Sequence, residues 1–529
     1  MKKSLSPRQG GPIDRLGFLW LALGTIFSLF AANGRWDLPL AAWLSPLFFL
    51  RFTRTRDPLS GFVGVLLASI SVMIFFFYES AIFSPILIVA GLIASAILAL
   101  PYLIDRLVFP RLSLVNGLLM TLVFPLSRAA FEYLISLAPT GSLWSLAYTQ
   151  YGNLPLLQLL SITGIYGVSF LMAWFASISN RIWEQHFSWP GIRTTTLLYG
   201  AVLVLVLLGG SIRLAFFPPS SSTVRVAGIS VASSTYQKTR HEISNFTKQE
   251  QLIPINRVQM HTALALLDDE LLARSQQEAR AGAKIIVWPE GGAVTLAEDA
   301  AGLIERGKTL AQQERIYLDM GLVVLLPQAP YVQDRAVLID SQGRIVWTYD
   351  KAHPVPGMET FPAGDGRLPV VDTSYGRIAN VICFDADFPD LMRQAGSGGV
   401  DLMLVPGNDW LEVDPWHTQN ATFRAIENGY SLVRQTSHGL AMTVDYQGHV
   451  MAATDYFTID QQTMIAYVPM KGVWTIYALV GDLFAWLCIA GSLMLGAFVL
   501  FVPSQRRLQA STPPSQPSSV SAAEQIGIR

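Results

Sequence analysis

The stretch VICFDADFPD, residues 381–390, places one of the chain's two cysteines between an apolar run and a cluster of acidic residues. A cysteine in such a position could act as a nucleophile, because its thiolate is a reactive species. A free cysteine in an apolar setting more often behaves as a small packing residue. The role of Cys383 therefore depends on the residues that accompany it.

Two other residues suited to supporting a nucleophile also follow apolar runs. Glu290 comes after IIVWP, Lys351 after IVWTYD, and Cys383 after ANVI. Charged or reactive groups at the ends of buried strands are where α/β folds commonly build their sites. Glu290 alone could be a carboxylate at a helix N-terminus, and Lys351 alone a solvated surface lysine. A glutamate, a lysine and a cysteine in three similar positions instead predict one shared site.

The segment that must position these residues reads as an α/β domain. Between residues 221 and 470, short β-branched runs alternate with stretches of helical periodicity, such as 256–281 and 298–315. A hairpin with a turn at 341–343 interrupts the alternation. This order predicts layered sheets and helices, and about 250 residues suffice for one well-buried domain.

The rest of the chain is far more apolar. The sequence is 51% hydrophobic and only 14% charged, whereas soluble proteins carry roughly 25% charged residues. The net charge of −1 and the lack of a basic stripe give no sign of nucleic-acid binding. A bilayer requires about 20 mainly apolar residues per helix. Eight spans are predicted, at 16–33, 38–50, 59–78, 84–108, 113–135, 156–179, 195–216 and 476–502.

Basic residues in the connecting segments indicate the orientation of these spans. Nearly all the lysines and arginines of the short loops fall on one side of the membrane if all eight spans are real, and Arg35 is the exception. The positive-inside bias then makes both termini cytoplasmic and places residues 217–475 on the opposite face. The first span follows MKKSLSPRQGGPIDR without an Ala-x-Ala-like cleavage site, so it is predicted to be a retained anchor.

The motifs around the three residues resemble a known family. WPEGG, YDKAHPVPGME and CFDADFP resemble the Glu-Lys-Cys signatures of the nitrilase, or carbon–nitrogen hydrolase, superfamily. The whole chain resembles its membrane branch, the bacterial apolipoprotein N-acyltransferases, notably at 138–171 and 423–450. The resemblance implies a multi-pass helical membrane domain of about eight spans, with an extracytoplasmic αββα sandwich inserted before the last span.

The resemblance also implies a division into domains. We expect seven spans within 1–220, the nitrilase-like catalytic domain at 221–472 and a C-terminal transmembrane helix at 473–503. Residues 504–529 are rich in proline and serine and should form a disordered cytoplasmic tail.

By resemblance, Cys383 is the nucleophile, Glu290 the general base and Lys351 the cation that stabilises an oxyanion. Glu359 matches the family's second glutamate and would orient Lys351 or the incoming amine. Other residues that would support the site or contact substrate are Phe384, Asp385, Asn408 and Trp410.

The reaction implied is a two-step acyl transfer without cofactor or metal. Cys383 would take a fatty acyl chain from a membrane phospholipid and pass it to the N-terminal amine of a diacylglyceryl-cysteine lipoprotein. This activity would complete lipoprotein maturation in the bacterial inner membrane, with the protein acting as a monomer. Two alternatives are a membrane-bound amidase or an N-acyltransferase for another amine. A third is a non-catalytic protein that binds lipoproteins.

Several motifs depart from the family pattern. VPGMET follows Lys351 in place of the usual Val-Pro-Phe-Gly-Glu-Tyr, Phe384-Asp385 replaces Tyr-Glu, and NDWL shortens Asn-Asp-Ala-Trp-Phe. The first strand leads into VASSTYQKTR, where the family has a Gln-Gly-Asn segment. The predicted triad is intact, whereas the substrate pocket differs.

Other polar residues allow more than one interpretation. Arg128 and Glu132 lie four residues apart within a span. They could form an ion pair with each other or contact a phospholipid head group. Tyr148, Gln150 and Tyr151 occupy an outward loop, where they could meet head groups or form an interfacial aromatic belt. We interpret three histidines as structural or polar-site residues, namely His353, His417 and His438. Cys488 is interpreted as a packing cysteine.

Overall fold

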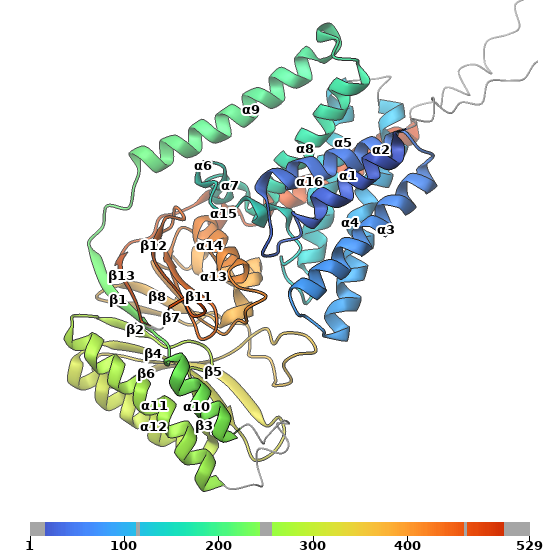
Figure 1. Ribbon diagram of the computed structural model, residues 1–529. Helices are drawn as coiled ribbons and strands as arrows, with labels where there is room; N and C mark the ends of the chain where they lie inside the picture. The colour runs from blue at the N-terminus through green and yellow to red at the C-terminus, as the bar shows by residue number, and fades with distance from the viewer. Residues whose placement is uncertain (1–15, 113–116, 244–256, 460–462, 502–529) are drawn as a thin grey trace, which may run out of the picture.

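The protein consists of a helical bundle and an α/β sandwich that lie side by side in the computed structural model (Figure 1). The structure describes residues 16–112, 117–243, 257–459 and 463–501. The basic N-terminal segment and the tail predicted to be disordered lie outside these residues. The predicted domain boundaries stay predictions.

The bundle is built from apolar helices. Their bounds are α1 Gly17–Leu29, α2 Pro39–Arg54, α3 Pro58–Glu79, α4 Pro85–Leu112, α5 Gly117–Ser136, α8 Ile165–Glu184, α9 Trp189–Phe216 and α16 Leu483–Phe501. Proline stands in the first turn of several, where its missing N–H costs nothing. Asp57 caps α3 by accepting a hydrogen bond from the Ser60 backbone N–H at 3.0 Å.

Each predicted span overlaps one of these helices, but the number eight is not confirmed. Four described helices, α3, α4, α5 and α9, are long and apolar enough to cross a membrane. A fifth span results if the bent segment 154–184 counts as one. Helix α1 and the Leu483–Phe498 part of α16 are also apolar, but they are shorter than these helices.

The continuous helix predicted at 156–179 is wrong. The segment forms two short helices, α6 Leu154–Leu157 and α7 Leu160–Thr163, and then bends by 118° into α8. Gly164 makes the bend possible, because its φ of +64° is readily adopted only by glycine. The Glu427 carboxylate accepts the freed backbone N–H of Ile165 at 2.8 Å, so the sandwich stabilises the bend.

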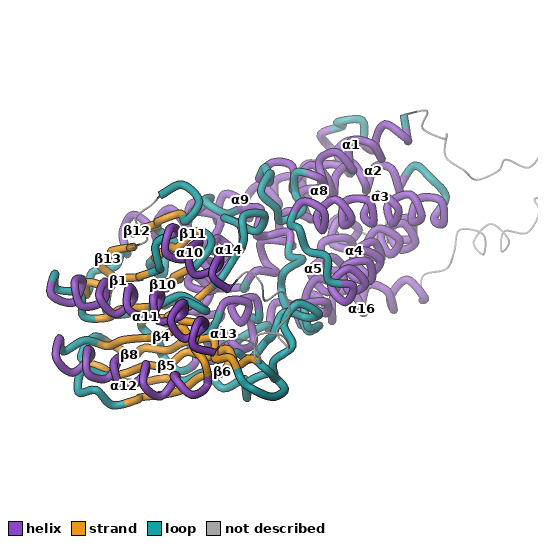
Figure 2. The backbone as a smooth tube through the Cα atoms, turned by 60° about the horizontal axis from the view of Figure 1, so that its bottom comes forward, coloured by secondary structure: helices purple, strands orange, loops and turns teal. Residues whose placement is uncertain are grey.

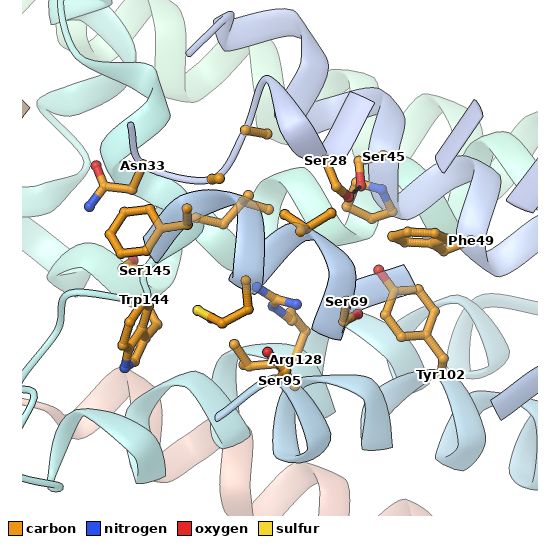
Figure 3. Close-up of a pocket in the computed structure, with 18 residues that line it drawn as sticks. Ser28, Asn33, Ser45, Phe49, Ser69, Ser95, Tyr102, Arg128, Trp144 and Ser145 are labelled. Carbon is orange, nitrogen blue, oxygen red and sulfur yellow. Dashed lines mark hydrogen bonds between the residues drawn. The ribbon is translucent and has the colours of Figure 1, made fainter. Parts of the chain in front are cut away.

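Arg128 and Glu132 form an ion pair inside the bundle. Arg128 Nε lies 3.5 Å from Glu132 Oε2, while Glu132 Oε1 accepts hydrogen bonds from Ser145 and Ser169. Arg128 also borders a cavity of about 120 Å³ that is lined by serines, Tyr102 and Trp144 (Figure 3). The ion pair favours the packing interpretation of these residues.

Two sheets form the centre of the sandwich (Figure 2). The first has the order β13-β1-β2-β4-β5-β6, with β3 beside β4, and the second has the order β12-β11-β10-β9-β8-β7. The strands of the first sheet are β1 Thr223–Ile229, β2 Ile285–Val287, β3 Ala293–Leu296, β4 Tyr317–Leu325, β5 Val332–Ile339, β6 Ile345–Asp350 and β13 Thr463–Pro469. Those of the second are β7 Val370–Thr373, β8 Gly376–Asn380, β9 Leu402–Gly407, β10 Ser431–Thr436, β11 Leu440–Val444 and β12 Val450–Asp455.

Helices cover the outer face of each sheet, which confirms the nitrilase-like α/β architecture. Helices α10 Ser233–Ile243, α11 Arg257–Arg280 and α12 Ala297–Glu314 lie on the first sheet, and α13 Pro389–Ser397 and α14 Trp416–Asn428 lie on the second (Figure 1). Strand β1 shows why both faces are apolar: Val224 and Val226 pack between the sheets, whereas Ala227 and Ile229 pack under the helices. Sequence analysis missed β13, which pairs antiparallel with β1 and closes the first sheet.

The sandwich faces the bundle through α13, α14 and the short helix α15 Ile476–Val480. The loop before α6, which includes the 3-10 turn η1 Leu146–Gln150, is buried at this contact. Tyr148 packs edge-on against Phe423, and Gln150 accepts a hydrogen bond from the indole of Trp43 at 3.0 Å. The predicted exposure of Tyr148 and Gln150 to head groups is therefore wrong, since both side chains are buried within protein.

Candidate active site

Cys383 lies where the second sheet meets the bundle. It follows β8 and opens the 3-10 turn η3 Cys383–Asp387. Its φ of +48° lies in the left-handed region, which costs a non-glycine residue of order 1–3 kcal/mol. The side chain is buried, and the thiol donates a long hydrogen bond of 3.9 Å to the Asn408 carbonyl oxygen. Such strain at a cysteine indicates a functional position.

Lys351 follows β6 and is surrounded by carboxylates. Its Nζ lies 2.7 Å from Glu290 Oε1, 2.8 Å from Glu359 Oε1 and 3.8 Å from Asp334 Oδ2. Glu290 follows β2 from the adjoining part of the first sheet, and both it and Lys351 are at most 4% exposed. The structure therefore brings the predicted glutamate and lysine into direct contact.

Burial and charge together set the protonation of this group. Burial disfavours the ammonium form of Lys351, but the Glu290 and Glu359 carboxylates outweigh it and raise the Lys351 pKa well above its usual value. Burial, and then the Glu290 charge, raise the pKa of Asp334 well above its usual value. Burial and Glu290 likewise raise the pKa of the Cys383 thiol, so the resting cysteine is protonated and requires a base.

The carboxylates of Glu290, Asp334 and Glu359 are close enough together to offer oxygens to a cation. The Lys351 ammonium lies among them and already supplies a positive charge. A second group, Cys383, Asp409 and His417, also brings potential ligand atoms within 4.8 Å of one another.

Asp385 fixes the turn that carries Cys383 to the segment that carries Lys351. Its Oδ2 accepts hydrogen bonds from the Tyr349 hydroxyl at 2.8 Å and from the Ile382 backbone N–H at 3.1 Å. Its Oδ1 accepts the His353 backbone N–H at 2.7 Å. Phe384 packs edge-on against Phe388 on the other side of the turn. Asp385 therefore joins the two ends of the site by hydrogen bonds, and Phe384 packs within the turn that Cys383 begins.

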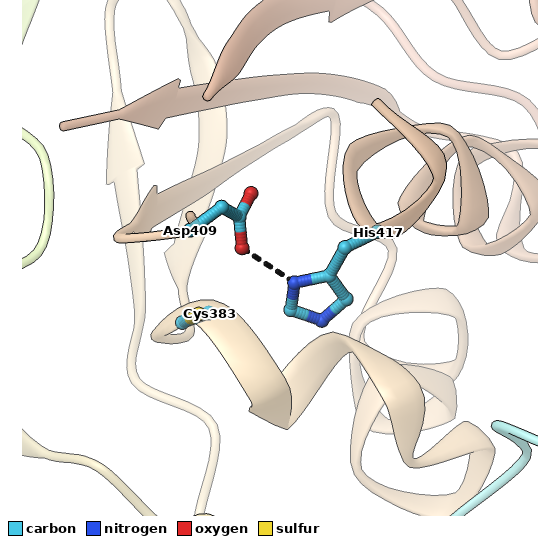
Figure 4. Close-up of side chains that lie close together, drawn as sticks. All are labelled: Cys383, Asp409 and His417. Atoms are coloured by element: carbon cyan, nitrogen blue, oxygen red, sulfur yellow. Dashed lines mark hydrogen bonds and ion pairs between the residues drawn. The ribbon is translucent and has the colours of Figure 1, made fainter. Parts of the chain in front are cut away.

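Sequence analysis missed a charged group beside Cys383. His417 lies between two carboxylates, with Nδ1 2.6 Å from Asp409 Oδ1 (Figure 4) and Nε2 2.8 Å from Asp387 Oδ2. Burial alone would lower the His417 pKa, but Asp409 and Asp387 raise it to about 9. Arg434 lies 3.1 Å from Asp409 Oδ1 and 3.7 Å from Cys383 Sγ. An arginine within SLVRQT, a stretch that reads as a strand, was the signal available in the sequence.

A cavity of about 180 Å³ opens beside Cys383. Its polar end is formed by Lys351, Glu359, Cys383, Asn408, Asp409 and His417. Its remaining lining is largely apolar and comes from both parts of the molecule, with Val413 and Trp416 from the sandwich and Ile82, Leu87 and Leu143 from the bundle. Trp410 also lines the cavity, and its indole donates a 2.8 Å hydrogen bond to the Ser80 carbonyl oxygen at the end of α3.

Comparisons with known proteins match the sandwich and the bundle to two different family models. A family model described as "Carbon-nitrogen hydrolase" matches residues 254–475, and one described as "Apolipoprotein N-acyltransferase N-terminal domain" matches residues 23–178. The apolipoprotein N-acyltransferase of Geobacter metallireducens is 28% identical over 72% of this chain and 74% of its own length. That of Shewanella oneidensis is 25% identical over 72% of this chain and 73% of its own. The chain belongs to the apolipoprotein N-acyltransferase family.

An amidase from Nesterenkonia sp. is similar in structure over 48% of this chain and 92% of the amidase chain, with 20% identity and a TM-score of 0.36.

Both matched regions of this N-acyltransferase family member contribute to the candidate active site. Glu290, Lys351 and Cys383 lie within the carbon–nitrogen hydrolase match. Leu87 and Leu143 of the apolar lining lie within the N-terminal match. A polar reacting group is thereby placed next to apolar lining from a membrane part, which is the environment that a lipid acyl group requires.

Proposed function

We propose that this protein transfers a fatty acyl chain from a membrane phospholipid, through a thioester on Cys383, to the N-terminal amine of a diacylglyceryl-cysteine lipoprotein. The observation that carries the proposal is the cavity in which Cys383 and Lys351 meet apolar residues of the helical bundle. A phospholipid can reach such a cavity from the bilayer with its acyl chain against the apolar lining.

In the first half-reaction, Glu290 accepts the thiol proton of Cys383 and the thiolate attacks the ester carbonyl of the phospholipid. The carbonyl electrons move to oxygen, and the Lys351 ammonium stabilises the resulting oxyanion. When the tetrahedral intermediate collapses, the lysophospholipid leaves with the proton that Glu290 returns. The products are a lysophospholipid and an acyl-Cys383 thioester.

In the second half-reaction, the lipoprotein amine attacks the thioester and Cys383 leaves as a thiolate. Glu290 takes the amine proton and returns it to the sulfur, so the enzyme regains its starting state. Glu359, at 2.8 Å from Lys351 Nζ, keeps the ammonium oriented in both steps. The largely apolar lining limits access of water to the thioester, which favours transfer to an amine over the hydrolysis expected of an amidase.

The surroundings fit a protein of the bacterial inner membrane. With both termini cytoplasmic, the sandwich lies on the periplasmic face, where both lipid substrates can approach sideways from the outer leaflet. We further propose that the chain works as a monomer.

Mass spectrometry of the full-length protein incubated with phospholipid tests the first half-reaction. We expect a hydroxylamine-sensitive fatty acyl adduct on the Cys383 peptide, lost in Cys383→Ala and kept in the matched variant Cys488→Ala. Cys488 is also buried but packs against Ala129 and Ala130 in the bundle. An unmodified Cys383 under conditions that trap thioesters would contradict the mechanism, and failure to acylate a diacylated lipopeptide would contradict the assigned acceptor.

A further inference from the structure

Arg434 contacts the proposed nucleophile directly. It stands on β10, has no exposed surface, and extends its guanidinium group toward η3. Its Nη2 lies 3.7 Å from Cys383 Sγ, and its Nη1 donates a 3.3 Å hydrogen bond to the Cys383 carbonyl oxygen. One guanidinium group therefore contacts both the reacting atom and the strained backbone that carries it.

Neighbouring side chains hold the guanidinium group in this orientation. Its Nε donates to the Thr418 hydroxyl at 2.9 Å, and its Nη2 donates to both Asp409 oxygens at 3.1 and 3.2 Å. Asp409 also accepts a hydrogen bond from His417 (Figure 4), which donates to Asp387 through its other nitrogen. A planar guanidinium suits several fixed contacts at once, which a lysine ammonium cannot reproduce.

The charges around Cys383 leave Arg434 available to a thiolate. Lys351 is already shared among three carboxyl groups, with two oxygens within 2.8 Å of its Nζ. The Asp409 carboxylate next to Arg434 is shared with the His417 imidazolium, so it neutralises Arg434 only in part. A negative charge on Sγ therefore interacts with the guanidinium group that already touches it as well as with the Lys351 ammonium.

We propose that Arg434 is a further catalytic residue, which stabilises the thiolate of Cys383 before acylation and when it leaves the thioester. The role rests on the proposed function for its place in the reaction cycle, but its effect on the thiolate does not depend on any substrate. A thioester sulfur carries no charge, so Arg434 interacts more strongly with the departing thiolate than with the acyl-enzyme. This difference is what accelerates a reaction step.

The test is the pH dependence of Cys383 alkylation by iodoacetamide in the full-length protein, read by mass spectrometry of the Cys383 peptide. Arg434→Met should shift the alkylation profile upward by about one pH unit, which slows alkylation at neutral pH by about tenfold. Arg434→Lys retains a charge and should recover part of the rate. The matched control is Arg424→Lys, because Arg424 is equally buried but pairs with Glu427 and Tyr148, away from the cysteine.

A second variant covers the case in which Arg434→Met fails to fold, as judged by its Tm. Thr418→Val keeps Arg434 and the local volume but removes the hydroxyl that holds Nε, and should slow alkylation about threefold. A wild-type pH profile in folded Arg434→Met, or in Thr418→Val when Arg434→Met is unfolded, would overturn the assignment. If Arg434→Met shifts the alkylation profile as expected but the wild-type protein transfers no acyl chain, only the proposed function is overturned.

Discussion

The indole Nε1 of Trp410 donates a 2.8 Å hydrogen bond to the carbonyl oxygen of Ser80, although the two residues lie 330 positions apart. Ser80 ends α3 in the helical bundle, and Trp410 follows β9 in the sandwich. Because Trp410 also lines the cavity beside Cys383, this bond fixes the membrane part against the wall of the candidate site.

Trp410→Phe should weaken phospholipid use while leaving most of the aromatic packing in place. The lost bond leaves the Ser80 carbonyl unsatisfied in a buried position, at a cost of about 1–3 kcal/mol. We expect kcat/KM for lysophospholipid release to fall about tenfold. Trp416→Phe is the matched control, because Trp416 lines the same cavity but donates only to Glu412, one helical turn away. Equal losses in both variants would contradict a role for the link between the two parts.

Lys351→Met should remove both activity and stability. Loss of the cation that stabilises an oxyanion typically costs about 10²–10³ in rate. It also leaves the carboxyl groups of Glu290, Glu359 and Asp334 without their shared partner, and breaking a buried ion pair in this way costs about 3–5 kcal/mol. Rates of acyl-Cys383 formation and thermal unfolding in detergent measure the two effects.

Lys471→Met is the control for the stability effect. Lys471 pairs with Asp401 at 3.2 Å, but its side chain is 70% exposed, so the pair contributes at most about 1 kcal/mol. A Tm for Lys351→Met as close to wild type as that of Lys471→Met would show that the buried carboxyl groups simply take up protons.

Stability should fall as pH rises from about 6.5 to 9, through His417. Because Asp409 and Asp387 raise the His417 pKa to about 9, the folded state keeps a proton there that the unfolded state releases near its usual pKa of about 6.5. The stabilising contribution is therefore complete below pH 6.5 and is lost as the pH approaches 9, for a total of about 3 kcal/mol. Tm measured across this range should decline less steeply in His417→Gln, and parallel curves would contradict the assignment.

Gly164→Ala should destabilise the bend between α7 and α8. The positive φ of Gly164 disfavours alanine, and a Cβ there would lie 2.5 Å from the Tyr477 ring. A loss of roughly 1–3 kcal/mol is expected from strain and contact together. Gly200→Ala in α9 is the control, because nothing lies within 4 Å of its Cβ position and alanine favours helix. The two variants should shift the Tm in opposite directions, and a Tm for Gly164→Ala at or above wild type would contradict the strain argument.

Local patterns in the sequence determined much of the molecule. The alternation of strands and helices between 221 and 470 predicted the α/β domain, and the apolar runs predicted the positions of the bundle helices. The motifs around Glu290, Lys351 and Cys383 led to the family, which the matched regions confirm. These features were accessible because strand and helix periodicity, bilayer-length apolar runs and short motifs all lie within continuous stretches of the chain.

Tertiary structure alone decided which distant residues meet. Arg434 and His417 reach Cys383 from β10 and α14, and neither is marked in the sequence by spacing from the cysteine. Tyr148 and Gln150 read as residues of an exposed loop but are buried, because the sandwich packs over them. The bend at Gly164 depends on Glu427, which lies 262 residues from the amide it binds. In each case the deciding contact joins side chains that are distant in the chain and become buried together, and local sequence does not encode that partner.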